Sequence, residues 1–322
     1  MRALACPASL KGTLSARAAA SALGKGFARA GVEAVELPIA DGGEGTLDAL
    51  HRALGGGWRE ERVHDAFGRP RMARWLVLPD GRAAVEAAEA IPLDPRRLDP
   101  IGASSRGLGE LIRAAGRPAE LIVGLGGTAN VDGGAGLLEV LDELPAPTRV
   151  ACDALVPLAD AARLFAPQKG AAPEQVHELE QRLAQMKRLA PYAELPGAGA
   201  AGGLGAALAS VGAILEPGAR LVLDMVGFDA RGFDLVVTGE GTVDRTTATG
   251  KAPGEVARRC AEAGVRCAVF GGLVVEPLPD AESYALSGKP ERAAEDLEEL
   301  ARRVEGARPD DTPPFTDSGP SA

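Results

Sequence analysis

The stretch LIVGLGGTANVDGG, residues 121–134, shows the pattern that decides the fold class. Its first four residues are apolar and have the length of a buried strand, and a glycine-rich loop containing Asp132 follows them. The same order of short apolar run, loop and amphipathic segment recurs along the chain. We predict strands at residues 3–6, 34–37, 121–124, 149–151, 235–237 and 267–270, and helices at 16–30, 108–115, 173–189 and 255–263. This alternation predicts an α/β fold with a mostly parallel sheet covered on both faces.

Two stretches break the alternation. Residues 58–89 hold short apolar runs around two turns and predict an antiparallel meander, and residues 191–228 begin with a Gly/Ala-rich segment. We therefore predict two domains with a cleft between them. The first is a Rossmann-like or flavodoxin-like domain, discontinuous over 1–57, 93–190 and 229–307, and the second is an α/β lobe over 58–92 and 191–228 that carries the meander.

The composition of the chain limits the classes of molecule that it is expected to bind. The chain has 322 residues, of which 46% are hydrophobic, so a sizeable core is available. A net charge of −10 argues against nucleic acid, because phosphate backbones select basic surfaces. There is no apolar run of about 18 residues, so no membrane partner is expected. The tail at 308–322 is rich in Pro, Asp, Ser and Thr and is predicted to be disordered.

The cysteines and histidines argue against several kinds of site. The four cysteines show no CxxC spacing and are interpreted as reduced, buried residues of a cytoplasmic protein. None of the three histidines lies in a glycine-rich stretch, so neither a Ser-His-Asp site nor a histidine-rich zinc site is expected. A general base would then be a carboxylate, and oxygen ligands favour Mg²⁺. Assembly into a homo-oligomer stays open.

Carboxylates and lysines recur within glycine-rich stretches. Glycine exposes backbone N–H groups, acids suit metal binding or proton transfer, and lysines suit phosphate. Most of these stretches follow a predicted strand, so parallel strands would bring them to one edge, although glycine and aspartate also simply form turns. The stretches are SLKG at 9–12, DGGEGT at 41–46, GGTANVDGG at 126–134, PQKG at 167–170, GAAGG at 199–203, and TGEGTVD at 238–244 followed by GK at 250–251. Together they indicate a phosphoryl-transfer site.

Common nucleotide-binding motifs are largely missing. No GxxxxGK[ST] loop occurs, because Gly250-Lys251 is followed by alanine and no glycine lies five residues before Gly250. A GxGxxA match at 124–129 follows a predicted strand and makes a dinucleotide-dependent oxidoreductase a further alternative. The nearby Asp132 suits a metal better than a pyrophosphate.

Six motifs in order give the chain a resemblance to the bacterial type I glycerate kinase family along nearly its full length. The family opens with a strand and Ser-Phe-Lys-Gly-Ser, which is similar to SLKGT here. The corresponding stretches are 9–13, 41–46, 126–136, 166–171, 196–205 and 238–253. The resemblance implies ATP-dependent phosphorylation of D-glycerate with Mg²⁺ on a two-domain α/β scaffold, with 2-phosphoglycerate the favoured product.

The resemblance and the residue chemistry together give candidate roles, because phosphoryl transfer needs positioning and neutralisation of negative charge. The candidate catalytic residues are Lys11, Asp41, Asp132, Glu240 and Asp244, with the base left unassigned among the four acids. The candidate metal ligands are Asp132, Glu240 and Asp244. The candidate residues for binding D-glycerate or nucleotide are Ser9, Gly42, Gly43, Glu44, Gly127, Thr128, Gly133, Lys169, Gly241 and Lys251.

The chain departs from the family pattern at several polar positions. It has Ala8 where the family usually has Asp, Val156 where it has Asn, and Thr242 where Arg is frequent. It also has Thr246 in place of Gln and Arg106 in place of Tyr. These changes leave an alternative open, a catalytically impaired relative that binds nucleotide or a hydroxy acid.

Overall fold

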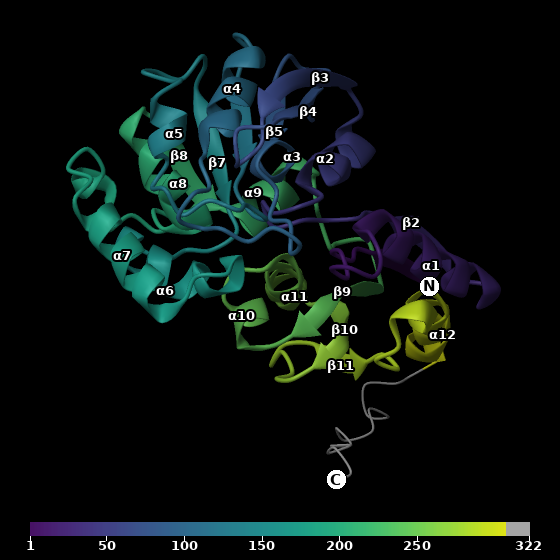
Figure 1. The fold of residues 1–322 in the computed structure, drawn as a ribbon. Helices are drawn as coiled ribbons and strands as arrows, with labels where there is room; N and C mark the ends of the chain where they lie inside the picture. The colour runs from purple at the N-terminus through teal and green to yellow at the C-terminus, as the bar shows by residue number, and fades with distance from the viewer. Residues whose placement is uncertain (307–322) are drawn as a thin grey trace. The chain divides into compact units, whose positions relative to one another are not determined.

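The computed structural model describes residues 1–306, so the tail predicted to be disordered lies outside the described residues. The chain divides into two compact units. Unit 1 comprises residues 1–38, 229–247 and 256 onward, and unit 2 comprises residues 39–228 and 248–255. The fold is α/β, as predicted (Figure 1).

Unit 1 contains a five-stranded sheet in the order β11-β10-β9-β1-β2, with every neighbouring pair parallel. The strands are β1 (Arg2–Ala5), β2 (Glu33–Glu36), β9 (Leu235–Val243), β10 (Arg266–Val274) and β11 (Glu282–Ala285). The central strands β1, β9 and β10 are largely buried, which explains their continuous apolar sequences.

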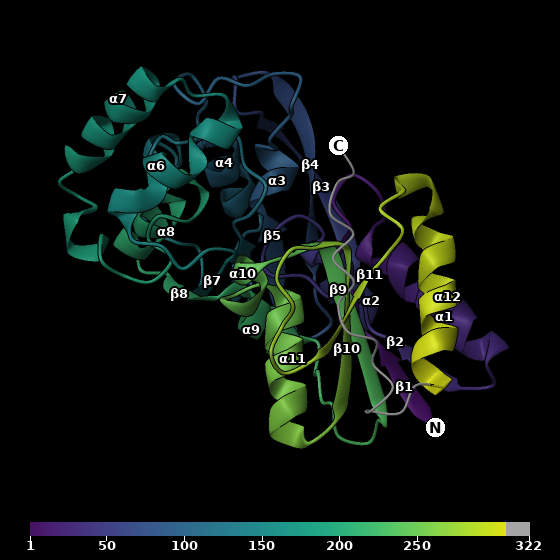
Figure 2. The same cartoon turned by 90° about the horizontal axis from the view of Figure 1, so that it is seen from below.

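Helices cover both faces of the sheet of unit 1. Figure 2 shows α1 (Ala16–Arg29) and α12 (Ala293–Gly306) side by side on one face, and α11 (Ala252–Ala263) on the other. Phe27 of α1 and Leu297 of α12 pack with Phe270 of β10 in one core. The helix α1 begins where Ser15 Oγ accepts a hydrogen bond from Ala18 N at 3.2 Å, an N-cap interaction.

Unit 2 contains a six-stranded mixed sheet in the order β3-β4-β5-β6-β7-β8. The strands are β3 (Gly57–His64), β4 (Pro70–Val77), β5 (Ala83–Glu86), β6 (Leu121–Gly124), β7 (Thr148–Cys152) and β8 (Ile214–Pro217). β3, β4 and β5 are antiparallel, so the predicted meander is present. From β5 to β8 the neighbours are parallel, so β5, β6 and β7 have their carboxyl ends at one edge.

The helices of unit 2 also lie on both faces of its sheet. Leu47 of α2 and Leu221 of α9 pack in one core with Ile122 of β6, whereas Leu108 of α4 and Leu204 of α8 pack in another with the opposite face. The helices are α2 (Thr46–Leu54), α3 (Ala87–Ala90), α4 (Arg106–Ala114), α5 (Ala135–Leu138), α6 (Ala161–Phe165), α7 (Pro173–Ala184), α8 (Ala200–Ser210) and α9 (Gly218–Met225). Short 3₁₀ turns lie at Leu158–Asp160, Pro167–Lys169, Ala190–Tyr192 and Pro290–Arg292, and α10 spans Arg245–Ala248.

The compact units differ from the predicted domain division. The segments 58–92 and 191–228 were expected to form a separate lobe, but β5 pairs with β6 and β8 pairs with β7. Both segments therefore share a sheet with residues 93–190. Residues 39–57, expected to belong with the N-terminal segment, also belong to unit 2. The turn signals show where the meander bends but not which strand its last member pairs with.

Several element boundaries also differ from the expectation. β9 continues to Val243, so the TGEGTV stretch is strand rather than loop, held by pairing with β10 as far as Val274. The helix expected at 173–189 ends at Ala184. All four cysteines are buried and free of disulfides, as expected. No helix within residues 1–306 combines the length and apolar composition needed to cross a membrane.

Candidate active site

Two glycine-rich loops meet at the carboxyl end of β6 in unit 2. Gly126 N donates a hydrogen bond to Gly42 O at 3.1 Å, which joins the 126–134 loop to the 41–46 loop. Gly42 has φ +93, and a Cβ there would lie 2.5 Å from the carbonyl oxygen of Ala151 on β7. Only glycine satisfies both constraints. The structure therefore brings together two of the stretches that the sequence singled out.

Asp41 and Glu44 occupy the 41–46 loop. The carboxylate of Asp41 accepts a hydrogen bond from Gly43 N at 3.2 Å, and Thr46 Oγ1 donates to Gly43 O at 2.7 Å. These bonds fix the turn and leave Asp41 half-buried and Glu44 exposed. The loop thus presents two carboxylates and a run of glycines at the edge where β5, β6 and β7 end.

A buried carboxylate that the sequence analysis missed supports this loop. Glu86 is the last residue of β5 and is 4% exposed. Its Oε1 accepts a hydrogen bond from Gly45 N and its Oε2 accepts one from Leu47 N, both at 3.1 Å. Burial raises the pKa of Glu86 to about 7, although the two N–H donors act in the opposite direction. The signal in the sequence was one acid inside the apolar run 83–88.

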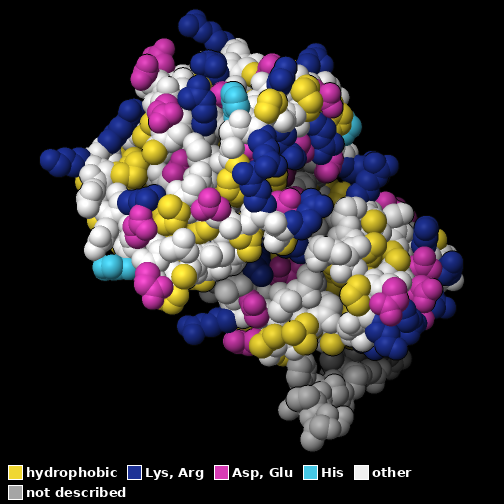
Figure 3. Space-filling view, viewed as in Figure 1, with side chains coloured by type: hydrophobic (Ala, Val, Ile, Leu, Met, Phe, Trp, Pro, Cys, Tyr) yellow, Lys and Arg dark blue, Asp and Glu magenta, His cyan; other side chains and the backbone are white. Residues whose placement is uncertain are grey.

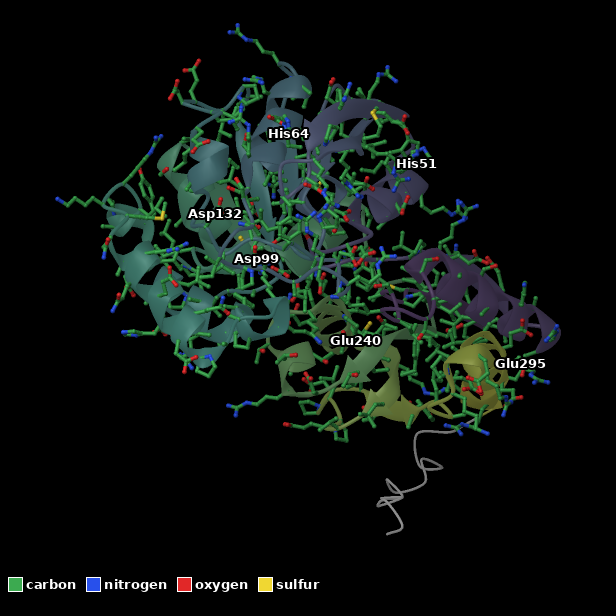
Figure 4. All side chains as sticks on the ribbon, in the orientation of Figure 1. His51, His64, Asp99, Asp132, Glu240 and Glu295 are labelled. Atoms are coloured by element: carbon green, nitrogen blue, oxygen red, sulfur yellow. The ribbon has the colours of Figure 1, made fainter. Side chains whose placement is uncertain are left out.

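Asp132, labelled in Figure 4, accepts five hydrogen bonds. Its Oδ2 accepts from Ser105 N and Ser105 Oγ, both at 2.8 Å, and from Gly136 N at 3.1 Å. Its Oδ1 accepts from Asn130 Nδ2 at 2.9 Å and Gly134 N at 3.0 Å. With five donors on two oxygens, Asp132 ties the start of α4 to the loop before α5. This arrangement makes it a poor metal ligand and a poor base.

Lys169 lies inside unit 2 instead of on its surface. Its ammonium donates to Asn130 O at 2.7 Å and lies 3.4 Å from Thr128 Oγ1, and the residue is 4% exposed. Burial lowers the pKa of Lys169 to about 8, while the carboxylates of Asp153 and Asp132 oppose this shift. Lys169 therefore holds the 126–134 loop through its backbone.

The loop 196–205 completes this cluster. Asn130 Nδ2 donates to Ala201 O at 3.2 Å, and Gly133 N donates to Gly202 O at 3.0 Å. Ala201 has φ +51, and the next two residues are also left-handed, a conformation that costs free energy for alanine. Asn130, fully buried at the centre of these contacts, is a further residue that the sequence analysis did not single out.

A second group of candidate residues lies at strand ends in unit 1. Ala8 N donates to Gly239 O at 2.9 Å, which joins the SLKG loop after β1 to β9. Lys11 is exposed on that loop. Its backbone N lies 3.6 Å from the position that a Cβ on Gly241 would occupy. The loop that carries Lys11 and the TGEG segment of β9 are therefore direct neighbours.

Glu240 and Asp244 are held by the threonines of α10. Glu240, half-buried on β9 (Figure 4), accepts a hydrogen bond from Thr247 Oγ1 at 2.7 Å. Asp244 Oδ1 accepts from Thr246 N at 2.8 Å and Thr246 Oγ1 at 2.5 Å, so Asp244 caps α10. Both acids thus have fixed orientations at the carboxyl end of β9.

The candidate residues fall into two groups, one in each unit. Unit 1 contains Ser9, Lys11, Glu240, Gly241 and Asp244. Unit 2 contains Asp41, Gly42, Gly43, Glu44, Gly127, Thr128, Asp132, Gly133, Lys169 and Lys251. The three expected metal ligands are divided between the units, and residues 1–306 contain no group of three or more His, Cys, Asp or Glu side chains arranged to hold a metal. On the face seen in Figure 3, charges of both signs are intermixed.

Glycine-rich loops that carry lysines and carboxylates on an α/β fold are typical of a phosphotransferase, and the comparisons with known proteins point to the same class. The glycerate kinase family model matches residues 3–144 and 145–303. Glycerate 2-kinase of Escherichia coli is 35% identical, with 79% of this chain and 80% of that protein covered. Glycerate kinase of Bacillus subtilis is 36% identical, with 80% and 81% covered.

A solved structure also matches this chain in fold and sequence. A crystal structure from Salmonella typhimurium LT2, described as a candidate glycerate kinase 2, superposes with a TM-score of 0.77 at 30% identity. The match covers 94% of this chain and 97% of that one. The chain belongs to the glycerate kinase family and is an enzyme of the kinase class.

Proposed function

We propose that this chain transfers the γ-phosphoryl group of ATP to a hydroxyl of D-glycerate and that the product is 2-phosphoglycerate. The observation that carries the proposal is the family match over residues 3–303, together with the glycine-rich strand ends that the structure forms in each unit. The choice of the 2-phosphate is supported by the relative in Escherichia coli, which is named for that product.

The contacts of each residue support different roles. Lys11 is exposed beside the backbone of β9 and is suited to neutralise phosphate charge. Asp41 lies beside the glycines of its loop, whose N–H groups could receive an anionic substrate, and we propose Asp41 as the base that accepts the hydroxyl proton. Asp132 and Lys169 are engaged within the fold and would position the 126–134 loop.

We propose that Mg²⁺ is bound by Glu240 on β9 and Asp244 directly after it, and not by a larger set of protein ligands. Mg²⁺ at nucleotide sites usually binds one or two carboxylates together with phosphate oxygens and water. Glu240 and Asp244, oriented by the threonines of α10, would hold the ion, which would neutralise phosphate charge during transfer. The four buried, free thiols support a reducing compartment and hence a cytoplasmic location.

An ADP-release assay with D-glycerate, ATP and Mg²⁺ tests the proposal, and ³¹P and ¹³C NMR of the product identifies the phosphorylated hydroxyl. Turnover that yields 2-phosphoglycerate supports the proposal. A 3-phosphate would contradict the assigned product, and no turnover by folded protein would contradict the activity.

The departures from the family pattern favour one second candidate, a binding protein without turnover. Val156 places its apolar side chain 3.0 Å from a Cβ built on Gly199, and Ala8 offers only its backbone to β9. Thermal stabilisation by glycerate or ATP without product formation would support this candidate.

A further inference from the structure

We propose that Glu86 is a positioning residue of the phosphoryl-transfer site: its carboxylate caps α2 from a neighbouring strand and so fixes the 41–46 loop. The functional part of this inference rests on the proposed kinase activity, whereas the capping itself does not.

The helix α2 lacks a cap of its own. Its first turn has N–H groups without partners inside the helix, and a Ser, Thr, Asp or Asn side chain at the N-cap normally accepts from them. Here the N-cap is Gly45, which has no side chain and has φ +94. Glu86 supplies the missing acceptor from the end of β5, with one oxygen on Gly45 N and the other on Leu47 N. A negative charge at a helix N-terminus is also favoured by the helix dipole.

The cap determines where the loop lies. Glu86 holds one end of the 41–46 loop through Gly45, and Gly126 N holds the other end through Gly42 O. Asp41 and Glu44 lie between the two anchors, and Thr46 Oγ1 bonds to Gly43 O inside the turn. If Glu86 releases the helix start, the loop loses the anchor at Gly45 and keeps the anchor at Gly42.

The surroundings of Glu86 make its charge sensitive to pH near neutrality. Burial raises its pKa to about 7, and the nearby carboxylates of Asp48 on α2 and Glu89 on α3 also raise it. The guanidinium of Arg74 on β4 interacts electrostatically with Glu86, but it forms its hydrogen bonds with Glu89. On protonation one oxygen of Glu86 becomes a hydroxyl, which donates, so one of the two backbone N–H groups loses its acceptor.

Stability and positioning change in opposite directions with pH. The folded-state pKa of Glu86 is above its ordinary value of 4.5, so its contribution to stability is complete below pH 4.5 and is lost as pH rises through about 7. The cap, in contrast, is complete only when Glu86 is ionised. As pH rises from 4.5 to about 7 the protein therefore loses stability at this site, while the growing ionised fraction of Glu86 completes the cap, a trade-off common at functional sites.

The test compares Glu86→Gln with Glu110→Gln. Glu110 is a matched control because its carboxylate also accepts a backbone N–H, that of His64 at 2.8 Å, but it anchors β3 to α4. In Glu86→Gln an amide NH₂ faces one of the two N–H groups. We expect hydrogen exchange at Gly45 and Leu47 to be about 5-fold faster than in the wild type, because a helix cap is typically worth about 1 kcal/mol. Glu110→Gln should leave these two amides unchanged.

Two further readouts separate positioning from general loss of structure. In ¹³C NMR of glutamate-labelled protein, one carboxyl signal should titrate near pH 7 and disappear in Glu86→Gln. In the wild type, log kcat/KM should rise with pH up to about 7, and Glu86→Gln should lose this inflection with its Tm changed little.

Unchanged exchange at Gly45 and Leu47 in folded Glu86→Gln would overturn the capping. A glutamate titration that persists in this variant would overturn the assignment of the proton site. If wild-type protein does not phosphorylate D-glycerate, the proposed function fails, but the exchange and NMR measurements still decide the role of Glu86. Glu86→Asp, which keeps the charge but shortens the side chain, should recover less than half of the lost protection.

Discussion

The ammonium of Lys169 donates a hydrogen bond to the backbone carbonyl of Asn130 at 2.7 Å inside unit 2. This bond joins a short 3₁₀ turn to the loop that carries Asp132. A buried ammonium is normally unfavourable, and here backbone and hydroxyl oxygens surround it in place of a directly bonded carboxylate. In this structure Lys169, which we expected to bind phosphate, thus supports the 126–134 loop by a hydrogen bond to its backbone.

We predict that the contribution of Lys169 to the free energy of unfolding changes with pH in the alkaline range. Its folded-state pKa is lowered from 10.5 to about 8, so its contribution increases with pH above 8 and is complete above 10.5. Relative to Lys169→Met, the unfolding free energy of the wild type should rise by about 1 to 3 kcal/mol across this range. Urea denaturation at several pH values measures it, and parallel curves for the two proteins would contradict the prediction.

Replacing Asp132 should mainly lower the free energy of unfolding and should affect catalysis only as a consequence. Five hydrogen bonds end on its carboxylate, and their donors would be left buried, so Asp132→Ala should cost roughly 3 kcal/mol or more. A double-mutant cycle with Ser105→Ala should give a coupling of about 1 kcal/mol in denaturation experiments. Asp99→Asn, which affects one bond to Gly102 N at the surface, serves as the control. If the free-energy changes of the two single variants simply add in the double variant, Asp132 and Ser105 are not coupled, which would contradict the proposed hydrogen-bond network around Asp132.

Glu240→Gln should lower activity with little loss of stability. The amide oxygen can still accept from Thr247 Oγ1, but the charge available to a metal ion disappears. We expect kcat/KM for phosphoryl transfer to fall by about 100-fold or more, a typical effect of losing one electrostatic group, with Tm nearly unchanged. Glu295→Gln on α12, whose carboxylate pairs with Arg292 at the surface, should behave like the wild type. Full activity of Glu240→Gln would exclude Glu240 from the site.

Gly42 and Gly55 form a matched pair for testing how closely the loop approaches β7. Both have positive φ, but a Cβ on Gly42 would meet Ala151 O at 2.5 Å and one on Gly55 would meet nothing within 4 Å. Gly55→Ala should cost about 1 kcal/mol from backbone strain, whereas Gly42→Ala should cost at least ~2 kcal/mol more and displace the loop. Denaturation and activity assays on both variants check this difference. Equal costs would mean that the loop shifts freely.

The sequence predicted the α/β class and most of the strands because apolar runs and glycine-rich loops alternate so regularly. It did not predict which strands pair. β8 at Ile214–Pro217 is an edge strand of only four residues that ends in Glu216 and Pro217, and β11 at Glu282–Ala285 has none of the long apolar runs of its neighbours. β5 pairs with β6, a strand that lies far from it in sequence, so no local sequence pattern predicts this pairing.

The candidate site could be predicted as a set of loops more readily than as a set of roles. Glycine-rich stretches identified the loops around Gly42 and Gly126, which do meet. The use of each carboxylate depends on donors far away in sequence: Ser105 engages Asp132, and Glu86 reaches Gly45 across 41 positions. Glu86 itself resembled a core position in an apolar strand, so composition gave it no special weight.

The strand order of unit 1 also has a consequence for synthesis on the ribosome. β1 lies between β2 and β9, and residues 3–5 pair with residues 235–237, which are synthesised much later. The chain between them contains most of unit 2, a continuous stretch that can collapse while translation continues. At about 5–20 residues per second, β1 waits on the order of ten seconds or more for its partner. The edge of β1 that later pairs with β9 therefore stays open during elongation, and an open strand edge is a template on which another chain can pair.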